Sequence, residues 1–342
     1  MNWFIWRQHR KQFLVFGLLL AVFAGLLIPN GIHLWHTYQQ ALTNCAQHPA
    51  LYSCDNLSDT LFTSRADGFI RIAEVLGTFG LPILLGLFIG SPLFAKEYEE
   101  GTNKLVWTQT VSRRKWLTTK IVWALGFALL YGILLTILVT WWSHTINTVA
   151  LNRFVQGHFE TQGLMPVAYS LFFTSVGFMM GAWFRKTLQA LAITFGVFVL
   201  CTASFASWIR PHYMTPVSIT APMGPNIFEN KIPAGAWVLS SDVVDKNGKI
   251  IGDIFPSAPA QCQQIIQQNQ VGSGSGTRVK AVRAVPGDPI DACLDKAGFH
   301  QIAKYQPSYR YWDFQEIESG IYLGMTAVAI AATYWLVLKR DA

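Results

Sequence analysis

Charged residues are scarce in this sequence. Asp, Glu, Lys and Arg make up 13% of its 342 residues, whereas about a quarter of an average soluble domain is charged. Apolar residues account for 51%, and the mean hydropathy is +0.30. These proportions argue against a soluble enzyme, a disordered chain and a coiled coil. With 13 Trp and 23 Phe, they predict a polytopic membrane protein.

Six long apolar runs in the chain contain no charged residue. Each is long enough to cross the hydrocarbon core as a helix, and none alternates like a barrel strand. The predicted fold is therefore an α-helical polytopic membrane protein with six transmembrane helices. The runs cover residues 12–32, 75–95, 121–143, 161–184, 187–209 and 319–338.

The interiors of these runs contain no ionisable residue. Proton-coupled transport and intramembrane proteolysis need buried titratable groups, so both are disfavoured. No nucleotide-binding motif occurs either; the Gly-Ser run 272–277 has no Lys in the Walker position. We therefore expect no enzymatic activity and no cofactor in this chain, and any ATP it uses must be bound by another chain.

Lysine and arginine in the short connections predict the orientation. Thirteen lie on the side that holds both termini, against Arg65, Arg71 and Arg153 opposite. Both termini are therefore predicted to be cytoplasmic. The net charge of +7 then arises from membrane topology, so no nucleic-acid partner is expected.

Two regions are predicted to lie outside, 33–74 and 210–318. They hold four cysteines, which suits an oxidising compartment. Three connectivities are possible; we favour the two pairings that close a loop within one region. A zinc site is the alternative, but no suitable ligand spacing occurs and no metal site is expected. The favoured pairings are Cys45–Cys54 and Cys262–Cys293.

The region 210–318 is predicted to form a small α+β extracytoplasmic domain. Asp245 to Gly248, with Asn-Gly between β-branched pairs, predicts a hairpin. Residues 258–269 predict a short helix, and a second helix is expected between Pro289 and Gly298. An enzyme with an external active site is a competing hypothesis, for which His212, His300 and Asp313 are candidates, although no nucleophile or metal set accompanies them.

Residues 96–120 form the longest segment on the predicted cytoplasmic side. An acidic cluster precedes a basic one, with a short amphipathic stretch, 105–111, between them. Two interpretations stay open. The segment is a solvated connection whose basic end meets anionic lipid, or it is a docking helix for a cytoplasmic partner, with Gly101 allowing the turn.

Residues 1–11 combine aromatic and basic side chains. This composition is typical of a helix lying in the inner interface. An aromatic-belt anchor for the first span explains it equally well. The residues concerned are Trp3, Trp6, Arg7 and Arg10.

Three groups of residues, in order along the chain, resemble the permease subunits of bacterial type-2 ABC exporters, in particular a branch common in actinobacteria. The resemblance covers the whole chain with its six spans. The groups are Trp6 to Arg10; Glu97 and Glu99 to Thr102 with Trp107 to Arg113; and Tyr305 to Pro307, Arg310 to Trp312, Phe314, Gln315 and Glu318.

The resemblance implies a protein of the bacterial cell membrane in which two permease subunits, identical or different, pair above two cytoplasmic ATPase subunits that bind ATP and Mg²⁺. Residues 1–11 would be the interfacial helix, 12–209 spans 1–5, 210–318 the outer domain, 319–338 span 6 and 339–342 the tail. Part of 96–120 would be the coupling helix. Its candidate coupling residues are Glu97, Glu99, Glu100, Gly101, Thr102, Arg113 and Arg114.

In this family spans 2 and 5 line the central path, so an aromatic, uncharged path implies hydrophobic or amphipathic cargo such as a drug, a peptide antibiotic or a lipid. The same side chains would equally suit packing or lipid contact. A second hypothesis is a sensor or immunity protein whose outer domain binds a peptide or antibiotic. The path candidates are Phe79, Leu84, Phe88, Phe195 and Phe198.

Overall fold

The computed structural model describes residues 2–47, 69–70, 72–73, 75–101, 112–150, 152–223, 231–251, 258–270 and 289–339. It confirms the predicted fold class of six long apolar helices with a small sheet domain inserted before the last one. Contacts divide the chain into a helical bundle, residues 1–213 and 312–342, and an inserted domain, Met214–Tyr311.

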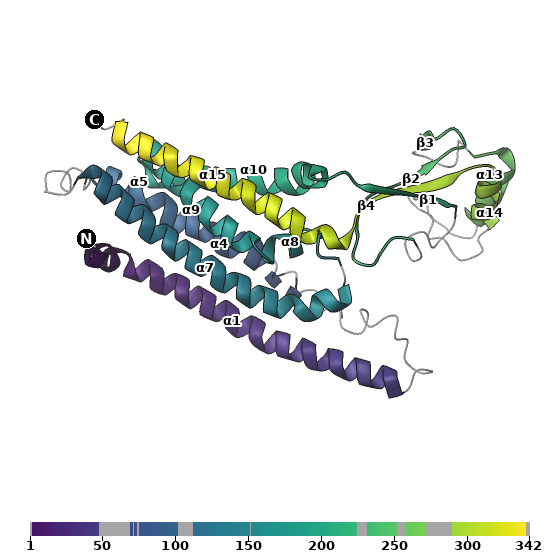
Figure 1. Ribbon diagram of the computed structural model, residues 1–342, viewed down its shortest axis with the longest axis horizontal. Helices are drawn as coiled ribbons and strands as arrows, with labels where there is room; N and C mark the ends of the chain where they lie inside the picture. The colour runs from purple at the N-terminus through teal and green to yellow at the C-terminus, as the bar shows by residue number, and fades with distance from the viewer. Residues whose placement is uncertain are drawn as a thin grey trace. The chain divides into compact units, whose positions relative to one another are not determined.

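The candidate membrane helices run from one end of the bundle to the other (Figure 1). Their apolar lengths are sufficient to cross a bilayer. They comprise His9–Gln47, Leu81–Glu99, Arg113–Thr148, Met165–Phe184, Thr187–His212 and Ser308–Lys339.

These helices differ from the predicted spans mainly at their ends. Helix α1 (Asn2–Gln47) has 46 residues and continues through Pro29, which at about 1.5 Å per residue is roughly twice the hydrocarbon thickness. Helix α7 (Arg113–Ala150) has 38. Polar and charged flanks extend these helices, because backbone hydrogen bonding continues where hydropathy falls.

Helix α9 (Met165–Phe184) packs against most of the other helices. It contacts α7, α10 (Thr187–Ser204) and the second span, which comprises η2 (Leu76–Gly80), α4 (Leu81–Leu85), η3 (Gly86–Gly90) and α5 (Ser91–Glu99). Most of the side chains of α9 are buried, which explains why it is apolar all round.

Glycines allow α9 to approach the second span closely. A Cβ built on Gly86 or Gly90 would lie 2.6 Å from the carbonyl oxygen of Phe173 or Thr174. On α9, a Cβ on Gly177 would collide with the oxygen of Gly86. Any side chain at these positions would therefore force the two helices apart.

The far end of the bundle, opposite the two termini, contains short elements. Gly157, with φ +97°, precedes α8 (His158–Thr161). Span 5 continues from α10 through η4 (Phe205–Ile209) and η5 (Arg210–His212). Span 6 is α15 (Tyr311–Lys339), which follows η6 (Ser308–Arg310). Residues 161–164, predicted as the start of span 4, lie outside α9.

The inserted domain contains an antiparallel sheet of order β1-β4-β2-β3. Its first and last strands pair with each other, in a register that sets Val217 opposite Tyr305. The strands are β1 (Val217–Pro222), β2 (Trp237–Val244), β3 (Ile250–Ile251) and β4 (His300–Gln306).

The predicted hairpin is confirmed between β2 and β3. The Asp245 carboxylate accepts hydrogen bonds from the backbone N–H groups of Asn247 and Lys249, at 2.8 and 2.9 Å. Gly248 adopts φ +77°, a conformation that favours glycine. The bond from Lys249, followed by that from Asn247, lowers the pKa of Asp245. The turn is therefore closed by its own carboxylate.

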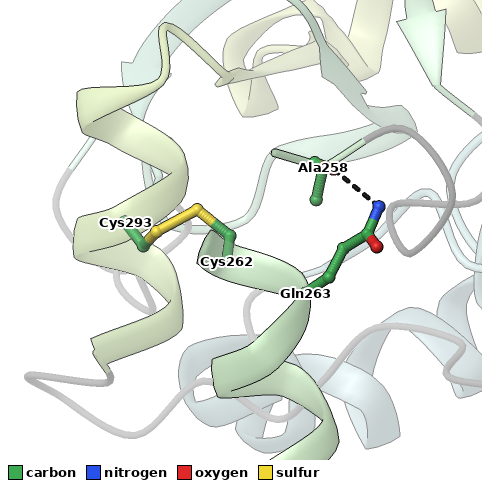
Figure 2. The surroundings of a disulfide bond; sticks show 4 residues. All are labelled: Ala258, Cys262, Gln263 and Cys293. Atoms are coloured by element: carbon green, nitrogen blue, oxygen red, sulfur yellow. Dashed lines mark hydrogen bonds between the residues drawn. A yellow bond between two sulfur atoms is a disulfide. The ribbon is translucent and has the colours of Figure 1, made fainter. Parts of the chain in front are cut away.

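Two helices of the domain are joined by a disulfide (Figure 2). Cys262 of α13 (Ala260–Gln270) bonds Cys293 of α14 (Pro289–Lys296), which confirms this predicted pairing. Cys262 is buried with Leu294 and Phe299 in a small core. Below it, the side-chain amide of Gln263 donates to the Ala258 carbonyl oxygen at 2.8 Å.

Cys45, near the end of α1, is buried and disulfide-bonded. Its predicted partner, Cys54, lies outside the described residues, so the Cys45–Cys54 pairing stays a prediction. Cys201 in α10 is the free thiol of the described chain.

Candidate functional site

The end of α5 on the termini side of the bundle contains a buried ion pair. Lys120 of α7 donates through Nζ to Glu97 Oε1, and these residues are 1% and 8% exposed. The ammonium also lies 4.8 Å from the Trp116 ring centroid. Glu97, predicted to contact an ATPase, is thus placed inside the subunit, where it joins the last turn of α5 to the first turns of α7.

The next two side chains of α5 contact other elements. The Tyr98 ring lies 4.9 Å from the guanidinium carbon of Arg185, in the turn between α9 and α10. Glu99 Oε2 accepts bonds from the backbone N–H and hydroxyl of Thr187, at 3.0 and 2.7 Å. Thr187 is the first residue of α10, so Glu99 satisfies an orphan donor at that helix N-terminus.

We refer to Glu97, Tyr98 and Glu99, with their partners Lys120, Arg185 and Thr187, as the α5 clamp. It ties the beginning of segment 96–120 to α7, to the α9–α10 turn and to α10. Three consecutive residues of a helix point in different directions. The end of α5 is therefore in contact with three other parts of the bundle.

The remaining candidate coupling residues are more exposed. Glu100 pairs loosely with Lys96 at 3.8 Å, both side chains being more than half exposed. Gly101, at φ +69°, turns the chain away from the helix. Arg113 is half-buried and Arg114 is exposed. Thr102 and the predicted docking stretch 105–111 lie outside the described residues.

The predicted interfacial residues belong to the first turns of α1, which is continuous with span 1. Arg7 and Arg10 are exposed; the side chains of Trp3 and Trp6 lie outside what the structure describes. Side-chain hydrogen bonds connect this part of α1 to η3. His9 Nδ1 lies 2.7 Å from Gln12 Oε1, and Gln12 Nε2 donates to the Phe88 carbonyl in η3 at 3.1 Å. Gln12 thus caps a carbonyl in a π-helical segment.

The candidate path residues differ in how deeply their side chains are buried. Phe198 is 4% exposed and packs against Phe173, and Leu84 packs against the main core. Phe88 and Phe195 are 52% and 51% exposed and lie on contacting elements, η3 and α10. Phe79 lies in η2, and its side chain is outside the described set. Phe88 and Phe195 are therefore the candidates with access to the bundle surface.

A buried charge cluster at the far end was missed by the sequence reasoning. The Arg210 guanidinium donates to both Glu318 oxygens, at 2.8 and 2.9 Å, and to Glu160 Oε1 at 2.7 Å. It also stacks 4.0 Å from the Phe159 ring centroid. All three charged side chains are at most 3% exposed. We call Arg210, Glu160 and Glu318 the far-end triad.

Tyrosines complete the triad's hydrogen bonding. Tyr213 and Tyr169 donate to Glu318 Oε2 and Oε1, at 3.2 and 3.4 Å. Burial, and then the Glu318 charge, raise the pKa of Tyr213, so its hydroxyl keeps its proton. Each triad member lies directly beside the end of a predicted span. The signal available in the sequence was that all three charges lie at span ends predicted to be on the same side of the membrane.

The proposed external enzyme site gains no support. His212 Nδ1 contacts the Trp208 carbonyl oxygen at 2.6 Å, and His300 Nδ1 the Gly298 carbonyl oxygen at 3.4 Å. Nδ1 of each ring thus contacts a backbone carbonyl oxygen close by in the sequence. Among the described residues, no cluster of three His, Cys, Asp or Glu side chains could hold a metal ion.

Residues 17–210 match the family described as ABC-2 membrane transporter related, which is more than half of the chain. The protein belongs to this family. The match covers the first five spans, with both the α5 clamp and Arg210. No curated protein and no solved structure matches the chain.

Family membership makes this protein a membrane transport component of the ABC-2 type, without catalytic activity of its own, and implies an ABC ATPase partner. The α5 clamp gathers α5, α7 and α10 at one end of the bundle.

Proposed function

We propose that the protein is the transmembrane permease subunit of an ATP-driven exporter in a bacterial cell membrane, with both termini cytoplasmic. Two permease subunits pair over two ATPase subunits, which bind ATP and Mg²⁺. The cargo is hydrophobic or amphipathic, because Phe88 and Phe195 lie exposed on contacting elements of spans 2 and 5. The resemblance of the three sequence groups supports the actinobacteria-like branch of these permeases.

The observation that carries this proposal is the α5 clamp. Segment 96–120 begins in the last turn of α5 and ends in the first turns of α7, and the clamp ties its beginning to α7 and α10. A force applied to the segment by an ATPase would therefore reach spans 2, 3 and 5 together. Exposed Glu100 and Arg114 lie in the segment and are available for polar contact with the ATPase.

Purification of the tagged protein from native membranes in mild detergent, with mass spectrometry of the bound chains, tests the proposal. We expect a near-stoichiometric ATPase subunit, which is lost in a Glu100→Ala, Arg114→Ala variant that keeps the wild-type melting temperature. A matched control exchanges exposed charges at the far end of the bundle, Asp313→Ala and Glu316→Ala. Isolation of the chain alone, under conditions that keep known transporters intact, would contradict the proposal.

A second function, a sensor or immunity protein, is favoured by one observation. The inserted domain has an open pocket of about 500 Å³, lined by the hairpin and by residues directly before α13 and after α14. Its lining combines apolar side chains such as Ile251 and Phe299 with the cations Lys246 and Lys249. A peptide-antibiotic panel in a thermal-shift assay tests this function. A shift that a Lys246→Ala, Lys249→Ala variant abolishes would support it.

A further inference from the structure

The end of span 5 and the start of span 6 are bonded to each other inside the bundle. Arg210 donates two hydrogen bonds to the carboxylate of Glu318. Three residues further on, Tyr213 bonds the same carboxylate, and its ring lies 5.6 Å from that of Phe314. The end of span 5, at η5, and the start of α15 thus meet through ionic, hydroxyl and aromatic contacts.

The segment that follows span 5 and the segment that precedes span 6 are also bonded to each other within the inserted domain. The side-chain amide of Gln306 donates to the Met214 carbonyl oxygen at 2.7 Å, and Arg310 Nη1 donates to that of Thr215 at 2.8 Å. Strand β1 then pairs with β4 over the full length of β1. The segment after span 5 and the segment before span 6 are therefore mutual partners in both units.

Separation of the end of span 5 from the start of span 6 would be unfavourable, because the charged side chains of the triad are buried. Arg210 is 1% exposed and Glu318 is 0% exposed. A guanidinium or carboxylate that loses its partner at such depth retains the desolvation cost without the compensating attraction. Glu160 also fixes α8 to the same guanidinium, and it accepts a bond from the Gly157 N–H at 2.5 Å. Three elements converge on one cation.

We propose that Arg210 is a positioning residue that fastens the far end of span 5 to the start of span 6, so that these two spans and α8 move as one body. Cargo would then not leave through an opening between spans 5 and 6 of one subunit. This consequence for transport rests on the proposed exporter function, whereas the fastening itself does not.

Spin-label distance measurements in lipid nanodiscs test the fastening. Labels are attached to Trp208→Cys on η4 and Leu323→Cys on α15, both exposed, in a Cys201→Ser background. We expect a narrow distance distribution that Glu318→Gln broadens at least about twofold, because the amide cannot replace the carboxylate as the partner of both donors. Glu316→Gln, an exposed neighbour on the same helix, is the matched control and should leave the width unchanged.

An Arg210→Met, Glu160→Gln, Glu318→Met variant, in which none of the three buried charges remains, separates fastening from stability. Replacement of buried ion pairs by uncharged groups commonly restores stability, so the melting temperature should recover from its Glu318→Gln value while the distribution stays broad. A triple variant as narrow as the wild type would assign the fastening to packing and overturn the proposal. So would a broad distribution in the unsubstituted background.

The transport consequence is tested with the same labels in the complex with the partner ATPase, trapped with ATP and vanadate. We expect the distance between the labels on η4 and α15 to keep its nucleotide-free value. A shifted distance would overturn the proposal. If the complex hydrolyses no ATP, the exporter function fails, while the nucleotide-free measurements still decide the fastening.

Discussion

At the residue scale, the charges that matter in this bundle are those removed from water. Glu97 and Lys120 are paired at one end, and Arg210 is paired with Glu160 and Glu318 at the other. A buried pair depends on both members, because the loss of one leaves an uncompensated charge. These residues therefore hold helices together, and contact with a soluble partner is left to exposed neighbours such as Glu100.

Glu97→Gln is expected to destabilise the bundle by about 3–5 kcal/mol, since Lys120 would be left buried beside a neutral amide. A Glu97→Met, Lys120→Met variant should lose much less, because neither charge remains. Thermal unfolding in detergent, followed by tryptophan fluorescence, measures both. Glu100→Gln is the control, and a Glu97→Gln variant as stable as this control would show that the pair does not join α5 to α7.

The sequence identified Glu97 as important but not what it contacts. Its partner Lys120 lies 23 positions along the chain, across residues 102–111, and helical periodicity cannot show which side chains two helices bring together. For the same reason, the sequence indicated only that Arg210, Glu160 and Glu318 flank the apolar runs. Each lies one position beyond an apolar run, where hydropathy alone cannot separate a solvated charge from a paired one.

At the element scale, close approach between α9 and the second span depends on the absence of side chains. Gly86 and Gly90 face Phe173 and Thr174 of α9, and Gly177 faces Gly86. The contact lies in a membrane span, where interfaces of small residues let helix backbones pack closely. Two π-helical segments, η2 and η3, occur in this same span.

Gly177→Ala should destabilise the bundle by about 1–3 kcal/mol, because an added methyl group must displace backbone atoms of the second span. Gly196→Ala on α10 is the control. A Cβ at that position meets nothing within 4 Å, so we expect a neutral or slightly stabilising effect from the lower backbone entropy of alanine. Thermal unfolding of both variants checks this. Equal stability would contradict the close contact.

Removal of the Cys262–Cys293 disulfide should destabilise the inserted domain by about 3–4 kcal/mol, the value expected for a bridge of this loop length. The cysteines are 31 positions apart. Hydrogen–deuterium exchange in a Cys262→Ser, Cys293→Ser variant should increase in α13 and α14. Exchange in α7 and α9, which belong to the bundle, should stay as in the wild type. Cys201→Ser is the control, and unchanged exchange in α13 and α14 would refute the prediction.

At the scale of the whole molecule, charge asymmetry remains the basis of the orientation. Basic residues concentrate at the end of the bundle that holds the α5 clamp and the α9–α10 turn. Since translocation of such clusters is disfavoured, this end is expected in the cytoplasm. The ATPase would then meet segment 96–120, and the inserted domain would be outside.

Reporter fusions test this orientation. Green fluorescent protein fused after Ala342 should fluoresce, whereas alkaline phosphatase inserted in the hairpin turn at Gly248, which is exposed and has an open surrounding, should be active. Exchange of the two reporters serves as the control and should silence both. Phosphatase activity at the C-terminus would reverse the topology and remove the basis for an ATPase contact at the α5 clamp.

The class of fold, the number of membrane helices and the hairpin at Asp245 were predictable from the sequence, which also favoured the pairing of Cys262 with Cys293. Each follows from local composition, turn chemistry or short separation along the chain. Only the tertiary structure decided that Glu97 pairs with Lys120, that Phe198 is buried while Phe195 is exposed, and that Arg210 joins Glu160 and Glu318. The reason is physical: burial and ion pairing depend on which helix faces lie against each other, and hydropathy carries no information on those neighbours.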